Sequence, residues 1–151
     1  MPRHAERRPL PHTPEQLFDL VADVDRYPEF LPWCTGVRVR QRSETLLVAD
    51  LVIGFKGITE RFTSRVHLDR PNHRIQVEYE KGPFKYLHNQ WKFEPSDQGA
   101  VVDFYVEFEF RSKILEKLIG MVFTEAVRKM VAAFEHRADA LYPNTKEIGM
   151  R

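Results

Sequence analysis

The sequence is poor in cysteine: Cys34 is the single thiol among its 151 residues, so no disulfide can form within the chain. Small secreted domains usually depend on disulfide frameworks, whereas one thiol is compatible with a reducing cytoplasm. The sequence also lacks an apolar run of the roughly 20 residues that a transmembrane helix needs, and its first residues lack the apolar segment of a signal peptide. We therefore expect a cytoplasmic protein that contacts membranes only peripherally, at the inner face.

An excess of one charge sign is also absent. The chain carries 23 basic and 22 acidic residues, a formal net charge of +1. No global field would attract nucleic acid, and we expect no DNA partner. A local basic surface is still expected on one predicted strand and on the first edge strand, from Arg38, Arg40, Arg42, Arg3, Arg7 and Arg8. This surface could bind phospholipid headgroups or ribosomal RNA, or it could be a solvated outer face of a sheet.

Motifs for metal binding and catalysis are missing as well. The six histidines do not show the spacing of metal ligands, and there is no second cysteine to complete a zinc site with Cys34. The chain contains no GxSxG or HExxH motif and no glycine-rich phosphate loop. We expect no metal, no required cofactor and no catalytic residue.

The longest periodic pattern predicts a helix over residues 112–141, with Ser112 as its N-cap and Pro143 beyond its end. At 100° per residue one face of this helix is apolar: Leu115, Ile119, Val122, Phe123, Ala126, Met130, Ala133, Phe134 and Leu141. Such a helix is about 40 Å long and has to lie across an apolar surface.

The rest of the chain predicts two short helices and seven strands. An edge strand is expected over 3–8. The Thr13-Pro14-Glu15-Gln16 capping box starts a helix over 14–22, and a single turn follows over 27–30 with Asp25 as its cap. A period of two then predicts strands over 36–41, 45–53, 58–68, 74–80, 85–93 and 100–111. Their short connections make the sheet antiparallel.

These elements predict an α+β helix-grip fold. One face of the strands is rich in aromatics, as in the alternation of Phe104, Val106 and Phe108. The expected architecture is a curved seven-stranded antiparallel sheet wrapped around the long C-terminal helix, with the two short helices between strands 1 and 2. We assign residues 1–142 to this single domain and residues 143–151 to a polar C-terminal tail.

Four ordered motifs carry a family resemblance. The most specific is YPEFLPWC at residues 27–34, and it is supported by GITERFTS at 57–64, by GPFKYL at 82–87 leading to Trp91-Lys92-Phe93, and by VEFEF at 106–110. Over nearly its whole length the chain resembles the coenzyme-Q-binding and ribosome-association-toxin (RatA) branch of the START-like, or polyketide-cyclase-like, helix-grip superfamily. The resemblance implies a lipid-binding domain that binds ubiquinone in support of respiration. It equally implies a factor that blocks the association of ribosomal subunits.

A long helix across a curved sheet can leave an apolar cavity, which would suit a quinone. The expected lining is Phe55, Phe62, Val66, Tyr79, Phe84, Leu87, Trp91, Phe104, Val106 and Phe108 from the sheet, with Val122, Phe123, Ala126 and Met130 from the helix. Ser64 and Asn89 share registers with the apolar rows and could hydrogen-bond a quinone carbonyl. The alternative is that these side chains fill a solid core.

The segment before the second strand contains two prolines and several large apolar side chains. Stiff aromatic segments lose little entropy on ordering, so this one could form a lid or mouth wall, with Tyr27, Pro28, Phe30, Leu31, Pro32 and Trp33. It could also be a packed corner between helix and sheet. Cys34 is expected to be a small buried hydrophobe.

We therefore interpret the chain as a non-enzymatic carrier or chaperone of a hydrophobic ligand, and we expect this ligand to be ubiquinone or a similar prenylated quinone. Two alternatives remain open: a RatA-like factor that binds ribosomal subunits, and a cyclase- or hydrolase-like enzyme that uses the same cavity.

Overall fold

The computed structural model describes residues 3–55 and 57–142. Its elements follow in the order β1 (Arg3–Leu10), α1 (Pro14–Ala22), a 3-10 turn η1 (Val24–Arg26), α2 (Tyr27–Phe30), β2 (Cys34–Arg42), β3 (Leu46–Phe55), β4 (Ile58–Asp69), β5 (Arg74–Lys81), β6 (Phe84–Ser96), β7 (Gly99–Phe110) and α3 (Lys113–Leu141). The predicted elements are confirmed with small shifts in their bounds. The polar tail assigned to residues 143–151 lies outside the described residues.

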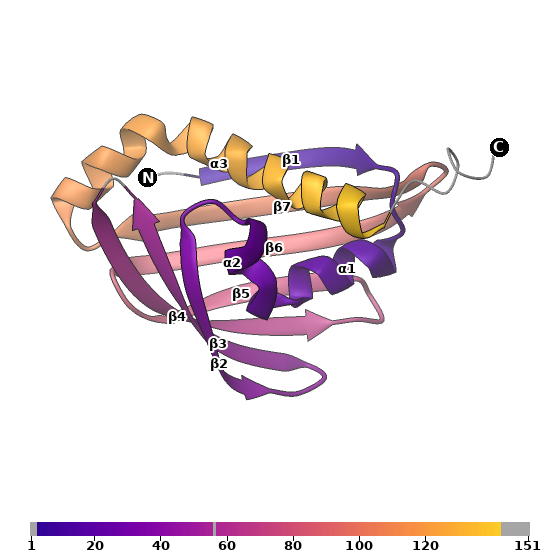
Figure 1. The fold of residues 1–151 in the computed structure, drawn as a ribbon, viewed down its shortest axis with the longest axis horizontal. Helices are drawn as coiled ribbons and strands as arrows, with labels where there is room; N and C mark the ends of the chain where they lie inside the picture. The colour runs from indigo at the N-terminus through magenta and orange to yellow at the C-terminus, as the bar shows by residue number, and fades with distance from the viewer. Residues whose placement is uncertain (1–2, 56, 143–151) are drawn as a thin grey trace.

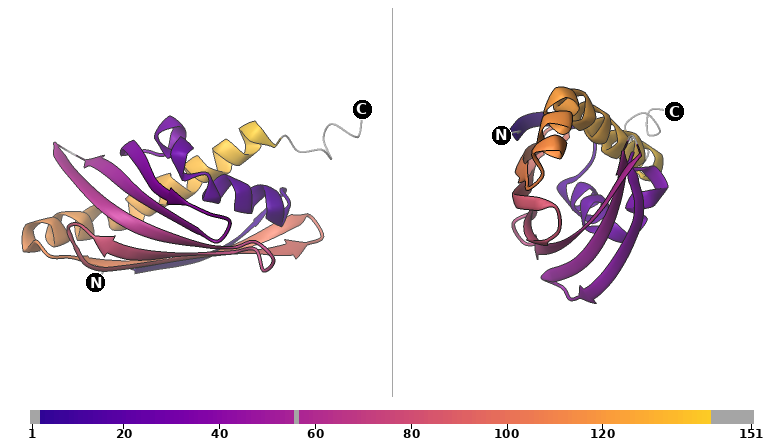
Figure 2. Two further views of the ribbon diagram at one scale, coloured as in Figure 1. Left: turned by 90° about the horizontal axis from the view of Figure 1, so that it is seen from below. Right: turned by 90° about the vertical axis from the view of Figure 1, so that its left-hand side faces the viewer.

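The seven strands form one antiparallel sheet in the order β1-β7-β6-β5-β4-β3-β2. Consecutive strands from β2 to β7 pair with each other, and β1 pairs with β7, so the two short helices connect opposite edges of the sheet. The sheet curves, and α1, α2 and α3 all lie on its concave side (Figure 1 and Figure 2). The predicted helix-grip fold is therefore confirmed.

The helix caps were mostly readable from the sequence. Thr13 Oγ1 accepts a hydrogen bond from Gln16 N at 3.1 Å, and Gln16 Oε1 accepts one from Thr13 N at 3.0 Å, which completes the capping box of α1. Ser112 Oγ caps α3 by accepting from Leu115 N at 3.2 Å. The predicted cap of α2 was wrong, because Asp25 lies inside η1 and Arg26 occupies the N-cap position.

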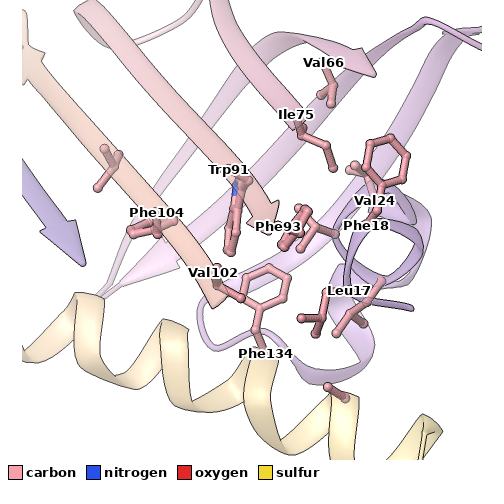
Figure 3. Packing of buried hydrophobic residues seen from close by; sticks show 14 of the residues in the cluster. Leu17, Phe18, Val24, Val66, Ile75, Trp91, Phe93, Val102, Phe104 and Phe134 are labelled. Carbon is pink, nitrogen blue, oxygen red and sulfur yellow. The ribbon is translucent and has the colours of Figure 1, made fainter. Parts of the chain in front are cut away.

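The main core lies between the sheet, α1 and the second half of α3. Phe18 of α1 is fully buried and meets Phe93 edge-on, with ring centroids 6.4 Å apart. Phe134 of α3 points at Trp91 on the concave face, and Phe93 and Phe104 flank the indole (Figure 3). Burial of such rings supplies much of the free energy of folding.

The buried side of α3 differs from the predicted one. Val127 is only 3% exposed although the predicted apolar face omitted it, whereas Leu141, which was placed on that face, is 45% exposed. The predicted lining residues of this helix, Val122, Phe123, Ala126 and Met130, are all half-buried. The apolar residues of the first turns shift the predicted apolar face away from the side on which the second half of the helix packs. The helix is therefore rotated about its own axis relative to the prediction.

The predicted basic surface is also corrected. A register shift between Val39 and Gln41 brings Arg42 opposite the inward-facing Leu47, and Arg42 Nη2 donates to Asp25 Oδ2 at 2.5 Å. Arg42 therefore does not share a face with Arg38. The arginines of β1 cannot join that face either, because β1 and β2 are opposite edges of the sheet.

Candidate ligand-binding site

An aromatic cluster surrounds Phe84 on the concave face of the sheet. The ring centroid of Phe84 lies 5.4 Å from Phe62, 5.4 Å from Tyr79, 5.6 Å from Phe108 and 4.7 Å from Phe110. We call these five rings the Phe84 cluster. Gly82 permits this arrangement, because its φ is +145° and it has no Cβ. A Cβ at this position would lie 2.6 Å from Phe62 Cβ, so any other residue would keep the β5–β6 turn from approaching the cluster.

A pocket of about 80 Å³ lies beside the Phe84 cluster, under the first turns of α3. The adjoining ends of β3 and β4 and the first turns of α3 line most of it: Ile53, Phe55, Ile58, Leu115, Leu118 and Ile119. Glu60 is a charged residue at this lining. The cavity prediction used the middle of α3 and missed these earlier helix residues. The apolar first turns of the helix were the signal that could have located them.

A second apolar pocket, of about 40 Å³, lies near Trp91, and of these two apolar pockets we call the one under α3 the larger pocket. The Trp91 ring is 4.6 Å from Phe104 and 5.1 Å from Phe134, and both of these residues line the pocket with Leu20 of α1. Ligand pockets usually measure about 300–1,000 Å³. Both pockets are smaller than this, so in the described conformation the protein's own side chains fill most of the space there.

The predicted lining residues of the sheet share the inward register. Val66, Phe84, Trp91, Phe104 and Val106 are buried. Phe55, Phe62, Tyr79, Leu87 and Phe108 are half-buried. Whether each one touches a ligand or only packs in the core stays a prediction.

Two inward polar side chains differ in their hydrogen bonds. Asn89 Nδ2 donates to Tyr105 O at 2.9 Å, and Asn89 Oδ1 accepts from Trp91 Nε1 at 2.9 Å. Ser64 is 2% exposed, and its Oγ has no hydrogen-bond partner in the part of the chain that the structure describes. Ser64 lies opposite Tyr79 in the sheet, next to the Phe84 cluster. A hydroxyl in this position can donate a hydrogen bond to an acceptor that enters the aromatic face.

The segment proposed as a lid or corner divides into two parts. Tyr27 Oη donates to Val21 O at 2.5 Å, and the rings of Tyr27 and Phe30 lie 5.5 and 5.3 Å from that of Phe134, so this part packs against α3. Burial raises the pKa of the Tyr27 hydroxyl. Trp33 has φ +67° and meets Phe55 edge-on at 5.6 Å, which places its ring beside the larger pocket.

The remaining segment residues are less enclosed: Leu31 and Pro32 are half-buried, and Pro28 is exposed. Cys34, which follows them, is 5% exposed as expected, and burial raises the pKa of its thiol. A lid function for the segment stays a prediction.

Among residues 3–55 and 57–142, no group of His, Cys, Asp and Glu side chains is arranged to hold a metal ion. Within the same residues, no helix has the length and apolar character needed to cross a membrane.

The chain is similar to several known proteins. Residues 10–135 match the family described as "Polyketide cyclase / dehydrase and lipid transport". The "Ribosome association toxin RatA" of Rickettsia prowazekii is 42% identical over 132 residues, which cover 85% of this chain and 90% of that protein. The "Coenzyme Q-binding protein COQ10 homolog B, mitochondrial" of Xenopus laevis is 34% identical over 144 residues, which cover 92% of this chain and 59% of that protein.

A solved structure agrees with the fold. The solution structure of an 18 kDa protein from Caulobacter crescentus has a TM-score of 0.76 and 40% sequence identity to this chain, and the match covers 94% of this chain and 99% of that one. The chain therefore belongs to the polyketide cyclase, dehydrase and lipid transport family, in the START-like branch that contains RatA and the coenzyme Q-binding proteins.

Proposed function

We propose that the chain binds a prenylated quinone, ubiquinone being the leading candidate, between the concave face of the sheet and α3. The observation that carries this proposal is the buried hydroxyl of Ser64 beside the Phe84 cluster, which has no hydrogen-bond partner among the described residues. A quinone offers a flat ring that can contact aromatic side chains and carbonyl oxygens that accept hydrogen bonds. Its isoprenoid tail would extend along the apolar helix and strands.

The relatives support a ligand of this class. The name of the Xenopus laevis relative states coenzyme Q binding, and that relative aligns with 92% of this chain. An apolar pocket with few polar groups is the usual form of a site for such a molecule. The ligand would enter where the larger pocket meets the first turns of α3, because the second half of the helix holds the main core.

We further propose that the ligand is carried or shielded without a chemical step and that no cofactor is required. A serine nucleophile needs an adjacent base, and no described residue forms a hydrogen bond with Ser64 Oγ. The other inward polar group, Asn89, is engaged with Trp91 and with the main chain. These contacts favour a binding protein over a catalyst.

Organic extraction tests the proposal. Protein purified without detergent, or incubated with vesicles that contain ubiquinone, is extracted and the extract is analysed by mass spectrometry. We expect a prenylated quinone in a fixed ratio to protein. If neither preparation retains any quinone, the proposal fails.

A second candidate function, binding to a ribosomal subunit, is favoured by the outer face of β2 and β4. Arg38 lies opposite Asp50, and Arg40 Nε donates to Asp50 Oδ2 at 2.7 Å, so both arginines point outward. Arg61 and Arg65 of β4 lie on the same outer face. Exposed arginines from two strands of one sheet can contact RNA phosphates. The names of the RatA relatives state ribosome association.

Co-sedimentation with free ribosomal subunits tests this second function. A double variant, Arg38→Glu with Arg61→Glu, reverses two charges of the outer face without breaking an ion pair among the described residues. A matched control, Arg3→Glu with Arg74→Glu, changes two exposed arginines on β1 and β5. The second function is supported if the wild type binds ribosomal subunits, the Arg38→Glu, Arg61→Glu variant does not, and the control variant still does. No co-sedimentation of the wild type would exclude it.

A further inference from the structure

Two of the most exposed large apolar side chains lie on the first half of α3. Ile114 is 79% exposed and Met121 is 76% exposed. At 100° per residue they are separated by about two turns along the helix and by only about 20° around its axis. With the half-buried Leu118 between them they form a continuous apolar row, which we call the outer stripe. Single exposed apolar side chains are ordinary, but a row on one helix face is not.

The outer stripe is continuous with the larger pocket. Leu118 belongs to the stripe and also lines the pocket, together with Leu115 and Ile119 from the same two turns. Apolar surface therefore extends from solvent, over the helix, to the space beside the Phe84 cluster. This half of α3 contains no fully buried residue before Val127, whereas Val127, Phe134 and Ala138 are buried, so the first half is the less firmly packed part of the helix.

The charges around the outer stripe are mainly positive. The segment from residue 111 to 129 contains five basic residues, Arg111, Lys113, Lys117, Arg128 and Lys129, and two acidic ones, Glu116 and Glu125. Both acids have partners: Glu116 Oε1 accepts from Phe110 N at 3.0 Å, and Glu125 Oε1 lies 3.5 Å from Lys129 Nζ. Lys113 and Lys117 are exposed on either side of Ile114 along the chain.

We propose that the outer stripe docks on a lipid bilayer that contains anionic lipids and that the larger pocket opens onto this interface. Apolar side chains of a surface helix enter the boundary of headgroups and acyl chains, while neighbouring lysines extend to the phosphates. A stable protein interface buries about 800 Å² on each partner. A single row of three side chains offers much less, so the stripe fits a membrane better than a protein.

This inference rests on the proposed function for its purpose, because a carrier of an apolar ligand must exchange that ligand with a bilayer. Docking itself needs no ligand. It can therefore be measured on vesicles without quinone, and ligand binding can be measured separately on quinone dissolved in detergent. Failure of one leaves the other intact.

Vesicle co-sedimentation of the full chain tests the inference, with phosphatidylcholine alone or mixed with phosphatidylglycerol. The double variant Ile114→Ser with Met121→Ser removes the stripe, and Leu141→Ser is a matched control at the far end of the same helix, where the side chain is 45% exposed. We expect the wild type to bind the anionic vesicles more tightly than the neutral ones. The double variant should lose about tenfold or more in partition coefficient, and the control should match the wild type.

The folded state of each variant is checked by its thermal midpoint, which should not fall, because the changed side chains already face solvent. Lys113→Glu with Lys117→Glu should remove the preference for phosphatidylglycerol. The inference is overturned if the wild type ignores anionic vesicles, if the double variant binds as the wild type does, or if the control loses as much. It is also overturned if the double variant only converts a dimer into a monomer, since a second copy would then cover the stripe.

Discussion

Trp91 Nε1 donates a hydrogen bond of 2.9 Å to Asn89 Oδ1, and both side chains lie on the concave face of β6. The bond fixes the indole between Phe104 and Phe134, at the junction of the sheet and α3. Asn89 is held in turn by the main chain of β7, through Tyr105 O. A polar side chain thus orients the largest ring of the core.

The first prediction concerns this pair. Asn89→Leu removes the acceptor and leaves a buried indole N–H unpaired, which should cost about 1–3 kcal/mol of unfolding free energy. Urea denaturation measures the loss. The control is Gln90→Leu, the exposed neighbour on the outer face of the same strand, which should change stability little. Equal losses in the two variants would contradict the role of Asn89.

The second prediction compares two neighbouring hydroxyls of β4. Thr63 and Ser64 are both 2% exposed, but Thr63 Oγ1 donates to Asp50 Oδ1 at 2.6 Å whereas Ser64 Oγ has no partner among the described residues. Thr63→Val should cost about 1–3 kcal/mol, because it removes a partner of a buried carboxylate, and Ser64→Ala should cost little or even stabilise.

Ligand binding should show the opposite order. Ser64→Ala should weaken quinone binding, and Thr63→Val, which lies on the outer face, should leave it unchanged. Paired urea titrations and quinone titrations of both variants provide the measurement. A large loss of stability in Ser64→Ala would mean that its hydroxyl already has a partner in the free protein.

The third prediction is the pH dependence of stability that Asp50 causes. Burial alone would raise the pKa of Asp50, but hydrogen bonds from Thr63 and Arg40 and the nearby charges of Arg40 and Arg61 hold the pKa below its ordinary value. A carboxyl whose pKa is lower in the folded state stabilises the protein above the unfolded pKa, near about 3.9, and loses this contribution as the pH falls through the folded value.

Asp50→Asn should therefore be less stable than the wild type near neutral pH, and the difference should shrink below about pH 4. Urea unfolding at several pH values measures it. Asp97→Asn, an exposed residue of the β6–β7 turn, is the control and should show no such convergence. A difference between wild type and Asp50→Asn that stays constant with pH would show that the carboxylate charge is irrelevant.

The fold was predictable because its signals are local. The capping box at Thr13 and Gln16 fixed the start of α1, and the alternation of Phe104, Val106 and Phe108 fixed the inward face of β7. Short turns then left antiparallel pairing as the natural arrangement of the strands. Each of these features depends on residues a few positions apart, so a single sequence contains it.

The site was predictable only in part, because its details depend on contacts between distant segments. The register shift after Val39 places Arg42 on the concave side of the sheet. No residue near Arg42 indicates that shift in the sequence. The rotation of α3 depends on how Val127 packs, and its first turns are apolar on several sides, as the exposed Met121 shows. Periodicity alone could not decide which of those sides faces the sheet.

The central claim is that an apolar ligand binds between the first half of α3 and the concave face, and one calorimetric comparison tests it most directly. A short-tail ubiquinone is titrated into the wild type, into Ile119→Trp, which places a larger ring in the pocket, and into Ala132→Trp, which adds the same ring at an exposed site on the helix. We predict that Ile119→Trp weakens binding by about tenfold or more, roughly 1.4 kcal/mol, while Ala132→Trp binds as the wild type does. Equal affinity of all three proteins, or no binding by the wild type, would contradict the claim.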